Sequence, residues 1–225
     1  MININQINVK NVIFDLDGTL IDSAPSILNS MRFCFKEAGI KPTRQFTYDL
    51  IGPPLSVAVN SLLTDTNKEM LPILINSFKK HYDNFGYLET QYYEGVPEMM
   101  AELRAMGLRL YIATNKRIDP TRKIIANLGW NEYFEAQFSL DYFKPSLINK
   151  KALLNLLRSE FPSMSEGAVY VGDRAEDAEA ANSNNFCFLW AYWGYGAKEL
   201  EASDFVIVEK PSQLSKIILD RVIYQ

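Results

Sequence analysis

Histidine and cysteine are scarce in this sequence. The 225 residues include one histidine, His81, and two cysteines, Cys34 and Cys187. A single imidazole excludes a site built on several histidines and a catalytic triad that depends on a second one. Two cysteines so far apart form neither a disulfide framework nor a thiolate metal cluster, so we expect reduced thiols in a cytoplasmic protein.

Long apolar runs and an excess of positive charge are also missing. The most apolar stretch, residues 186–195, is short and contains Gly194, whereas a membrane-spanning helix needs roughly 20 apolar residues. No positive charge precedes Lys10, and the apolar stretch after it is interrupted at Asp15, so we expect no secretory signal peptide. The formal net charge of −4 argues against the basic surface of a nucleic-acid binder. We expect neither a membrane nor a nucleic acid as partner.

The apolar residues that are present, within a 48% hydrophobic composition, follow the periods of strands and helices. Strands that alternate with helices imply βαβ crossovers and a mainly parallel sheet. The expected fold class is α/β with a Rossmann-like parallel sheet. We predict strands at residues 12–14, 108–113, 168–171, 186–191 and 204–208, and helices at 97–106, 119–128, 147–159, 175–184 and 211–222.

A helical segment interrupts this alternation after the first strand. Apolar residues recur at helical spacing from residue 24 to a stop at Gly39, and again from residue 71 to Gly86. We therefore predict that residues 22–93 are an inserted α-helical domain. Residues 1–21 and 94–225 would then form a discontinuous α/β core, with linkers near Asp22 and Glu94.

Two carboxylates follow the first predicted strand. Asp15 and Asp17 are alternate residues of an extended segment, so their side chains start out on the same face. Gly18 then lets the chain turn away, which leaves both carboxylates at the strand end. Taken alone, this pattern is as compatible with an ordinary acidic turn as with a site.

Three further groups of polar residues lie at strand ends or in loops. They are Thr114 with Asn115, Lys144 before Pro145, and Asp173 with Asp177. Each has an ordinary structural explanation, as a helix cap, a surface charge or a turn residue. Ligands of open α/β sheets sit beyond the carboxyl ends of the strands, where all these residues fall. Their common location therefore favours one shared site.

The residues of this expected site suit phosphoryl transfer. Asp15, Asp17, Asp173 and Asp177 cannot all ionise close together without a counter-ion. Oxygen ligands without nitrogen or sulfur suit Mg²⁺, which also binds phosphate oxygens. Lys144 would add a cation. Thr114 and Asn115 can donate hydrogen bonds to the same phosphate, so we expect them to be phosphate-binding residues.

The four groups resemble the motifs of the haloacid dehalogenase-like superfamily. The match covers nearly the whole chain, and Ser23-Ala24-Pro25 resembles the branch that carries a helical cap at this point. Within that branch the chain is most similar to phosphoglycolate phosphatase-like enzymes. The resemblance implies a Mg²⁺-dependent phosphatase that acts on a small phosphorylated metabolite.

The resemblance also implies a role for each residue. Asp15 would be the nucleophile that forms an aspartyl-phosphate, and Asp17 the general acid and base. Lys144 would neutralise the nucleophile and the phosphate, while Thr114 orients the phosphoryl group. The implied metal residues are Asp15, Asp17 through its backbone carbonyl, Asp173, and Asp177 as support.

Substrate and reaction type stay open in the sequence. Phosphoglycolate phosphatases often carry a basic residue before the glycine of the cap turn, whereas this chain has none next to Gly52, and Lys41 and Arg44 are out of register. A phosphomutase of the same branch is the second possibility. A non-catalytic protein that binds a phosphorylated ligand or a partner is the third. The sequence leaves the oligomeric state undetermined.

Overall fold

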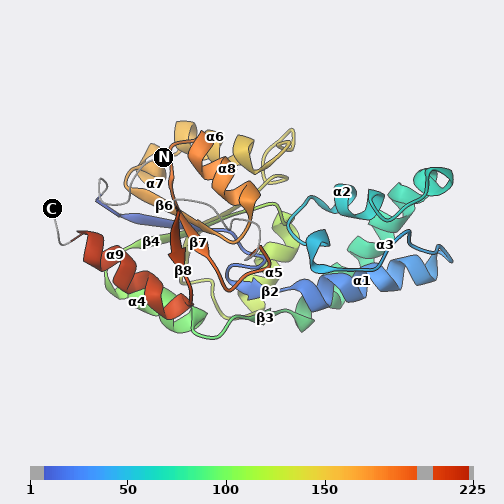
Figure 1. Ribbon diagram of the computed structural model, residues 1–225, viewed down its shortest axis with the longest axis horizontal. Coiled ribbons are helices and arrows are strands. Elements are labelled where there is room, and N and C mark those ends of the chain that lie inside the picture. Colours follow the sequence, from blue (N-terminus) through green and yellow to red (C-terminus); the bar gives the residue numbers. More distant parts are fainter. Residues whose placement is uncertain (1–7, 197–204, 223–225) are drawn as a thin grey trace.

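The computed structural model describes residues 8–196 and 205–222. It has two parts, an α/β core and an elongated group of helices that projects from one end of it (Figure 1). The core contains a six-stranded sheet with the order β5-β4-β1-β6-β7-β8, and every neighbouring pair is parallel. Its strands are β1 (Asn11–Phe14), β4 (Arg109–Thr114), β5 (Phe134–Ser139), β6 (Ala168–Gly172), β7 (Cys187–Ala191) and β8 (Val206–Val208).

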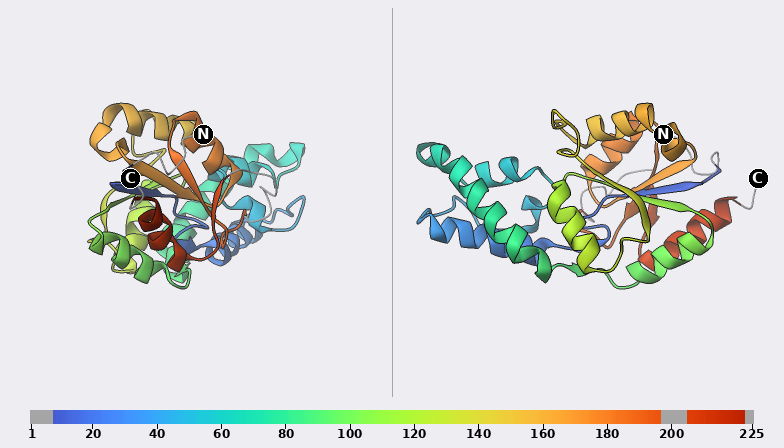
Figure 2. Two further views of the ribbon diagram at one scale, coloured as in Figure 1. Left: turned by 60° about the vertical axis from the view of Figure 1, so that its left-hand side comes forward. Right: turned by 180° about the vertical axis from the view of Figure 1, so that it is seen from behind.

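Helices cover both faces of this sheet (Figures 1 and 2). One face packs against α4 (Val96–Ala105), α5 (Ile118–Asn127) and α9 (Leu214–Val222). The other packs against α6 (Lys150–Glu160), α7 (Pro162–Ser165) and α8 (Ala175–Ser183). Side chains of β1 alternate between the two layers, with Val12 and Phe14 on one side and Ile13 on the other. The expected α/β class with a Rossmann-like parallel sheet is confirmed.

The projecting helices have an apolar core of their own, which includes Met31, Leu74 and Phe78. We call this unit the cap. Its elements are α1 (Ala24–Glu37), α2 (Leu55–Asn60), α3 (Leu71–Asn84) and the 3₁₀ turns η2 (Tyr48–Leu50), η3 (Asp65–Met70) and η4 (Gly86–Glu89). The chain enters and leaves the cap through a short antiparallel ribbon of β2 (Ile21–Asp22) and β3 (Gln91–Tyr92).

The sequence pattern missed some elements of the core. It did not reveal β5, an edge strand whose sequence alternates irregularly, with Glu135 exposed and Phe138 buried. The helix expected from residue 147 begins only at Lys150, and the last helix is preceded by the 3₁₀ turn η5 (Pro211–Gln213). The predicted start of the last strand, Asp204, lies outside the described residues. Within the described ranges, the helices are too short or too polar to cross a membrane.

Candidate active site

The central strand β1 delivers the first carboxylates to the edge of the sheet. All four of its residues are buried, and its ladder to β6 continues into Asp15, whose backbone N–H donates to the Val171 carbonyl at 2.8 Å. Gly18 has a φ of 87°, and a Cβ there would overlap the carboxylate of Asp173. Because only glycine fits both constraints, the turn after β1 can lie directly against the loop after β6.

Three carboxylates meet at this edge. Oxygen atoms of Asp15, Asp173 and Asp177 all lie within 4.8 Å of one another, and the three residues are buried. Asp177 is in the first turn of α8 and accepts hydrogen bonds from the backbone N–H groups of Asp173 and Arg174, at 3.1 and 3.0 Å. The structure therefore brings together three of the four predicted metal residues through their side chains.

The loop that follows β7 holds Asp173 in place. Its Oδ2 accepts a hydrogen bond from the backbone N–H of Tyr195 at 2.8 Å, and its Oδ1 accepts one from the Thr19 hydroxyl at 3.2 Å. The Trp193 indole donates to the Thr19 carbonyl at 2.9 Å. The Tyr195 hydroxyl donates to Asp22 at the entrance of the cap, also at 2.9 Å. This loop therefore connects the carboxylate cluster to the β2–β3 ribbon through which the chain enters the cap. The aromatic sequence of the loop did not indicate this role.

The cation beside the carboxylates is Lys150. Its Nζ lies 2.9 Å from Asp15 Oδ1 and 2.5 Å from Asp177 Oδ1, and its side chain is 4% exposed. Asn149 caps α6, since its side chain accepts a hydrogen bond from the Ala152 N–H at 2.9 Å. Because Asn149 is the N-cap residue, Lys150 is the first residue of the helix, and this position directs its side chain into the core.

Lys144 does not lie where the sequence placed it. Its side chain is exposed, in the loop that precedes α6, and it forms no ion pair with any residue that the structure describes. The expectation that Lys144 neutralises Asp15 is therefore corrected to Lys150. The physical reason is that α6 begins only after its N-cap residue Asn149, three residues later than predicted. The loop that carries Lys144 therefore lies on the surface, away from the carboxylates. Recognising Asn149 as a helix cap is the signal that would have found Lys150.

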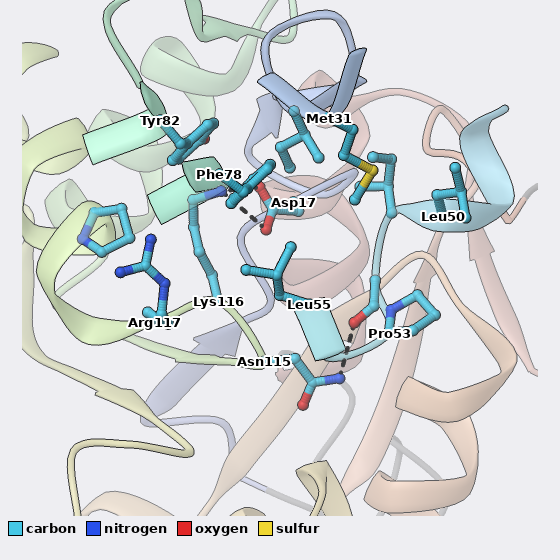
Figure 3. Close-up of a pocket in the computed structure, with 14 residues that line it drawn as sticks. Asp17, Met31, Leu50, Pro53, Leu55, Phe78, Tyr82, Asn115, Lys116 and Arg117 are labelled. Carbon is cyan, nitrogen blue, oxygen red and sulfur yellow. Dashed lines mark hydrogen bonds and ion pairs between the residues drawn. The ribbon is translucent and has the colours of Figure 1, made fainter. Parts of the chain in front are cut away.

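Asp17 faces a different group of residues. Its carboxylate pairs with Lys116 Nζ at 3.0 and 3.3 Å and accepts a hydrogen bond from the Ser23 hydroxyl. The same ammonium lies 4.7 Å from the centre of the Tyr82 ring, on α3 of the cap. The side chain of Asp17 is thus absent from the three-carboxylate cluster and lies at the junction of core and cap (Figure 3).

Thr114 is the last residue of β4, which lies next to β1 in the sheet, and Asn115 follows it. Thr114 is buried, and its hydroxyl accepts a hydrogen bond from the Lys116 N–H at 3.2 Å. Asn115 donates to the Gly52 carbonyl of the cap at 3.0 Å (Figure 3). It also donates to Glu176 at 3.2 Å. Thr114 therefore ends the strand at the sheet edge as predicted from its position, while the amide of Asn115 connects the core to the cap.

Burial shapes the electrostatics of the cluster. Burial raises the pKa of Asp15 to about 7; Lys150 opposes this rise and Asp177 adds to it. Burial, together with the charges of Asp177 and Asp15, raises the pKa of Asp173 to about 8. Burial alone would lower the pKa of Lys150, but the two carboxylates beside it raise the value well above the usual range. Lys150 is therefore a fixed cation that does not balance the cluster alone.

The cluster fits a hard divalent cation. Its ligand atoms are carboxylate oxygens without nitrogen or sulfur, which is the donor set of such ions. Asp15 Oδ1 is buried and accepts no well-aligned hydrogen bond from the described residues, although Lys150 is close. A cation would supply both the missing contact and the missing positive charge.

A pocket lies between the cap and the core beside Asp17 (Figure 3). The core contributes Asn115, Lys116, Arg117 and Pro120 from the segment after β4. The cap contributes side chains that are largely apolar: Ile27, Met31, Leu50, Ile51, Pro53, Leu55, Phe78 and Tyr82. Of the four candidate carboxylates, Asp17 lines this pocket.

Comparison with known proteins identifies the family. The family model described as haloacid dehalogenase-like hydrolase matches residues 12–191, which include Asp15, Asp17, Thr114, Lys150, Asp173 and Asp177. The chain belongs to this family. The resemblance seen in the sequence motifs is thus confirmed.

The relatives of this chain carry different names. The chain is 30% identical to the phosphoglycolate phosphatase of Aquifex aeolicus over 221 residues, which cover 96% of this chain and 99% of that protein. It is also 30% identical to the tyrosine-protein kinase PtkA of Mycobacterium tuberculosis over 188 residues. That match covers 82% of this chain but only 62% of PtkA. A 5'-nucleotidase of Pseudomonas aeruginosa is 26% identical and matches 84% of this chain and 85% of its own.

Solved structures share the fold of this chain. The crystal structure of a predicted phosphatase from Clostridium acetobutylicum superimposes with a TM-score of 0.78 at 28% identity, covering 95% of this chain and all of that one. The structure of PtkA from Mycobacterium tuberculosis gives a TM-score of 0.75 at 24% identity and covers 93% of this chain. The core and its cap therefore form a recurring fold.

Proposed function

We propose that this hydrolase is a Mg²⁺-dependent phosphatase that acts on small phosphorylated molecules through an aspartyl-phosphate intermediate. The observation that carries the proposal is the buried cluster of Asp15, Asp173 and Asp177 with Lys150 at the carboxyl edge of the sheet. The relatives named as phosphatases and as a nucleotidase support the same class of substrate. Two free, buried cysteines agree with the cytoplasmic setting expected from the sequence.

In the first proposed step, a carboxylate oxygen of Asp15 attacks phosphorus and the bond to the leaving oxygen breaks. Asp17 begins this step as the carboxylic acid and donates its proton to that oxygen, since its side chain faces the pocket into which the leaving group extends. Lys150 stabilises the negative charge on Asp15 and on the phosphoryl oxygens. The Thr114 hydroxyl, buried at the end of β4, orients the phosphoryl group.

In the second proposed step, Asp17 takes a proton from a water molecule, whose oxygen attacks phosphorus. The bond to Asp15 breaks, which releases inorganic phosphate and restores the carboxylate. Asp15, Asp173 and the backbone carbonyl of Asp17 would hold Mg²⁺, with Asp177 fixing the loop of Asp173. When bound, Mg²⁺ would supply charge stabilisation for the phosphoryl oxygens.

We further propose that residues 22–93 act as a closing cap over a core of residues 1–21 and 94–225. The chain passes between the core and the cap through β2 and returns through β3. This ribbon supports the division, because two strands of two residues each are a narrow connection. A cap that closes over the site would exclude water during the first step.

The proposal is tested by phosphate release from a panel of phosphorylated metabolites, with Mg²⁺ and with a chelator. We expect turnover only with the metal, and no turnover by the Asp15→Asn variant, which keeps the size of the nucleophile but not its charge. Circular dichroism would show that the variant is folded. Phosphate release by the folded variant would contradict the assignment of Asp15, and turnover in chelator would contradict the role of the metal.

The same experiment separates the alternatives. A phosphomutase would require a bisphosphate activator and return the phosphoryl group to the substrate. A non-catalytic binding protein would release no phosphate from any member of the panel. The presence of Asp15, Asp17, Lys150 and Asp173 together favours an enzyme over the non-catalytic binding protein, and phosphate release without an activator would favour the phosphatase over the phosphomutase.

A further inference from the structure

The pocket beside Asp17 carries information about the leaving group. Asp17 forms part of its wall, so whatever is attached to the leaving oxygen must occupy this space (Figure 3). Most of the lining that the cap contributes is hydrocarbon, with Met31, Leu50 and Leu55 facing the core segment after β4. An apolar lining of this kind favours an apolar group and makes the burial of a charge costly.

Two aromatic side chains make this lining more specific. The rings of Phe78 and Tyr82, one helical turn apart on α3, lie 5.3 Å apart with an angle of 8° between their planes. Both border the pocket, together with the thioether of Met31. Aromatic rings and thioether sulfur atoms are favourable neighbours for another aromatic ring.

The cations in the pocket already have carboxylate partners. Lys116 pairs with Asp17, and its side chain is 6% exposed. Arg117 donates two hydrogen bonds to Asp83 of the cap, at 2.8 and 2.5 Å. A substrate carboxylate would have to compete with Asp17 or Asp83 for these cations.

The basic residues of the cap lie elsewhere. Lys41 and Arg44 line a different hollow of the cap, with Arg32, and Arg44 pairs with Asp49 at 2.7 Å. Neither residue lines the pocket beside Asp17. Lys41 and Arg44, which are out of register with Gly52 in the sequence, are thus not placed to bind a substrate carboxylate in this pocket.

From this lining we infer that the substrate is a phosphate monoester of an uncharged alcohol that carries an aromatic ring. The inference rests on the phosphatase activity proposed above and specifies its substrate class. The phosphate would lie at the carboxylate edge of the sheet, and the ring would lie against Phe78, Tyr82 and Met31. A leaving group with a carboxylate, such as that of phosphoglycolate, would be disfavoured.

The test compares three substrates whose leaving groups are all primary alcohols: benzyl phosphate, cyclohexylmethyl phosphate and phosphoglycolate. Because the leaving groups are similar in reactivity, differences in kcat/KM report on the pocket. We expect kcat/KM for benzyl phosphate to exceed that for phosphoglycolate by about 100-fold. We expect cyclohexylmethyl phosphate to fall several-fold below benzyl phosphate.

Paired variants on α2 locate the effect in the pocket. Leu55 is half-buried and lines the pocket, whereas Val57 of the same helix is 57% exposed and does not. We expect Leu55→Arg to lower kcat/KM for benzyl phosphate about tenfold and to raise it for phosphoglycolate about tenfold, since it adds an unpaired cation. Val57→Arg should leave both values within about twofold of the parent protein. Circular dichroism would check the folding of both variants.

The possible outcomes are distinct. Equal or faster hydrolysis of phosphoglycolate by the parent protein would overturn the inference, while leaving the proposed phosphatase intact. Equal hydrolysis of the cyclohexylmethyl and benzyl esters would overturn the aromatic assignment. Failure to hydrolyse these three esters and every member of the metabolite panel would instead overturn the proposed function.

Discussion

At the scale of single residues, the distance of each lysine ammonium group from the carboxylate cluster determines which lysine can neutralise it. Lys150 and Lys144 are six positions apart, yet one is buried against Asp15 and Asp177 and the other is exposed to solvent. Removing the cation of a buried ion pair leaves its partners uncompensated, which costs about 3–5 kcal/mol. Removing an exposed lysine costs little.

We therefore predict that Lys150→Met lowers kcat at least about 100-fold and the free energy of unfolding by about 3 kcal/mol. Lys144→Met serves as the matched control and should keep both values close to those of the parent protein. Phosphate-release kinetics and urea denaturation measure the two effects. A larger loss of activity in the Lys144 variant would show that the loop before α6 rearranges during turnover and that Lys144 is the cation in use.

At the scale of elements, contacts other than the β2–β3 ribbon also attach the cap to the core. Arg117, at the start of α5, forms a two-pronged pair with Asp83 of α3. Arg174 donates to the carbonyls of Tyr48 and Ile51, both at 2.8 Å. These contacts join the core to the cap next to the pocket, so they stabilise the arrangement of core and cap in which the pocket is formed.

We predict that Asp83→Asn raises KM about fivefold with a smaller effect on kcat, because a partly exposed pair contributes about 1 kcal/mol to holding the cap in place. Asp65→Asn is the matched control: Asp65 pairs with Lys68 within the cap, and its side chain is 92% exposed. Steady-state kinetics of both variants measure the effect. Arg117→Gln should act like Asp83→Asn, and the double variant should show no additional loss if the pair acts as a unit. A KM unchanged by any of these would argue that the pair does not position the cap.

At the scale of the whole molecule, the carboxylate cluster joins segments that are far apart in the chain. Asp15 follows the first strand of the core and Asp173 follows β6, with the whole cap between them in sequence. A cation bound to both would therefore stabilise the folded protein as a unit, since the site does not exist in the unfolded chain.

We predict that saturating Mg²⁺ raises the Tm of the full chain relative to chelator. A concentration of about 100 times Kd adds roughly 2.7 kcal/mol, which is about 5–10 °C for a protein of this size. Asp173→Asn should abolish most of this shift, whereas Asp65→Asn should retain it, because Asp65 is exposed on the cap. Differential scanning calorimetry gives the comparison. An equal Mg²⁺ shift in the Asp173 variant would place the cation outside the proposed site.

The sequence alone determined the architecture and most of the site. Strand and helix periods are local properties, and parallel strands must present their carboxyl ends at one edge. That is why Asp15, Thr114, Asp173 and Asp177 could be assigned to one edge before any contact was known. The edge strand β5 was missed because its apolar alternation is irregular.

Only the tertiary structure decided which side chains meet. The choice of Lys150 over Lys144 depends on where α6 begins and on which way its first turn faces the sheet. The separation of Asp17 from the carboxylate cluster, and its pairing with Lys116 beneath Tyr82, depend on how the cap lies against the core. A sequence pattern fixes the order and period of elements, whereas contacts between distant segments arise from packing. The sequence therefore indicated where the candidate site lies, and the packing determined which lysine lies beside its carboxylates and which residues line the pocket.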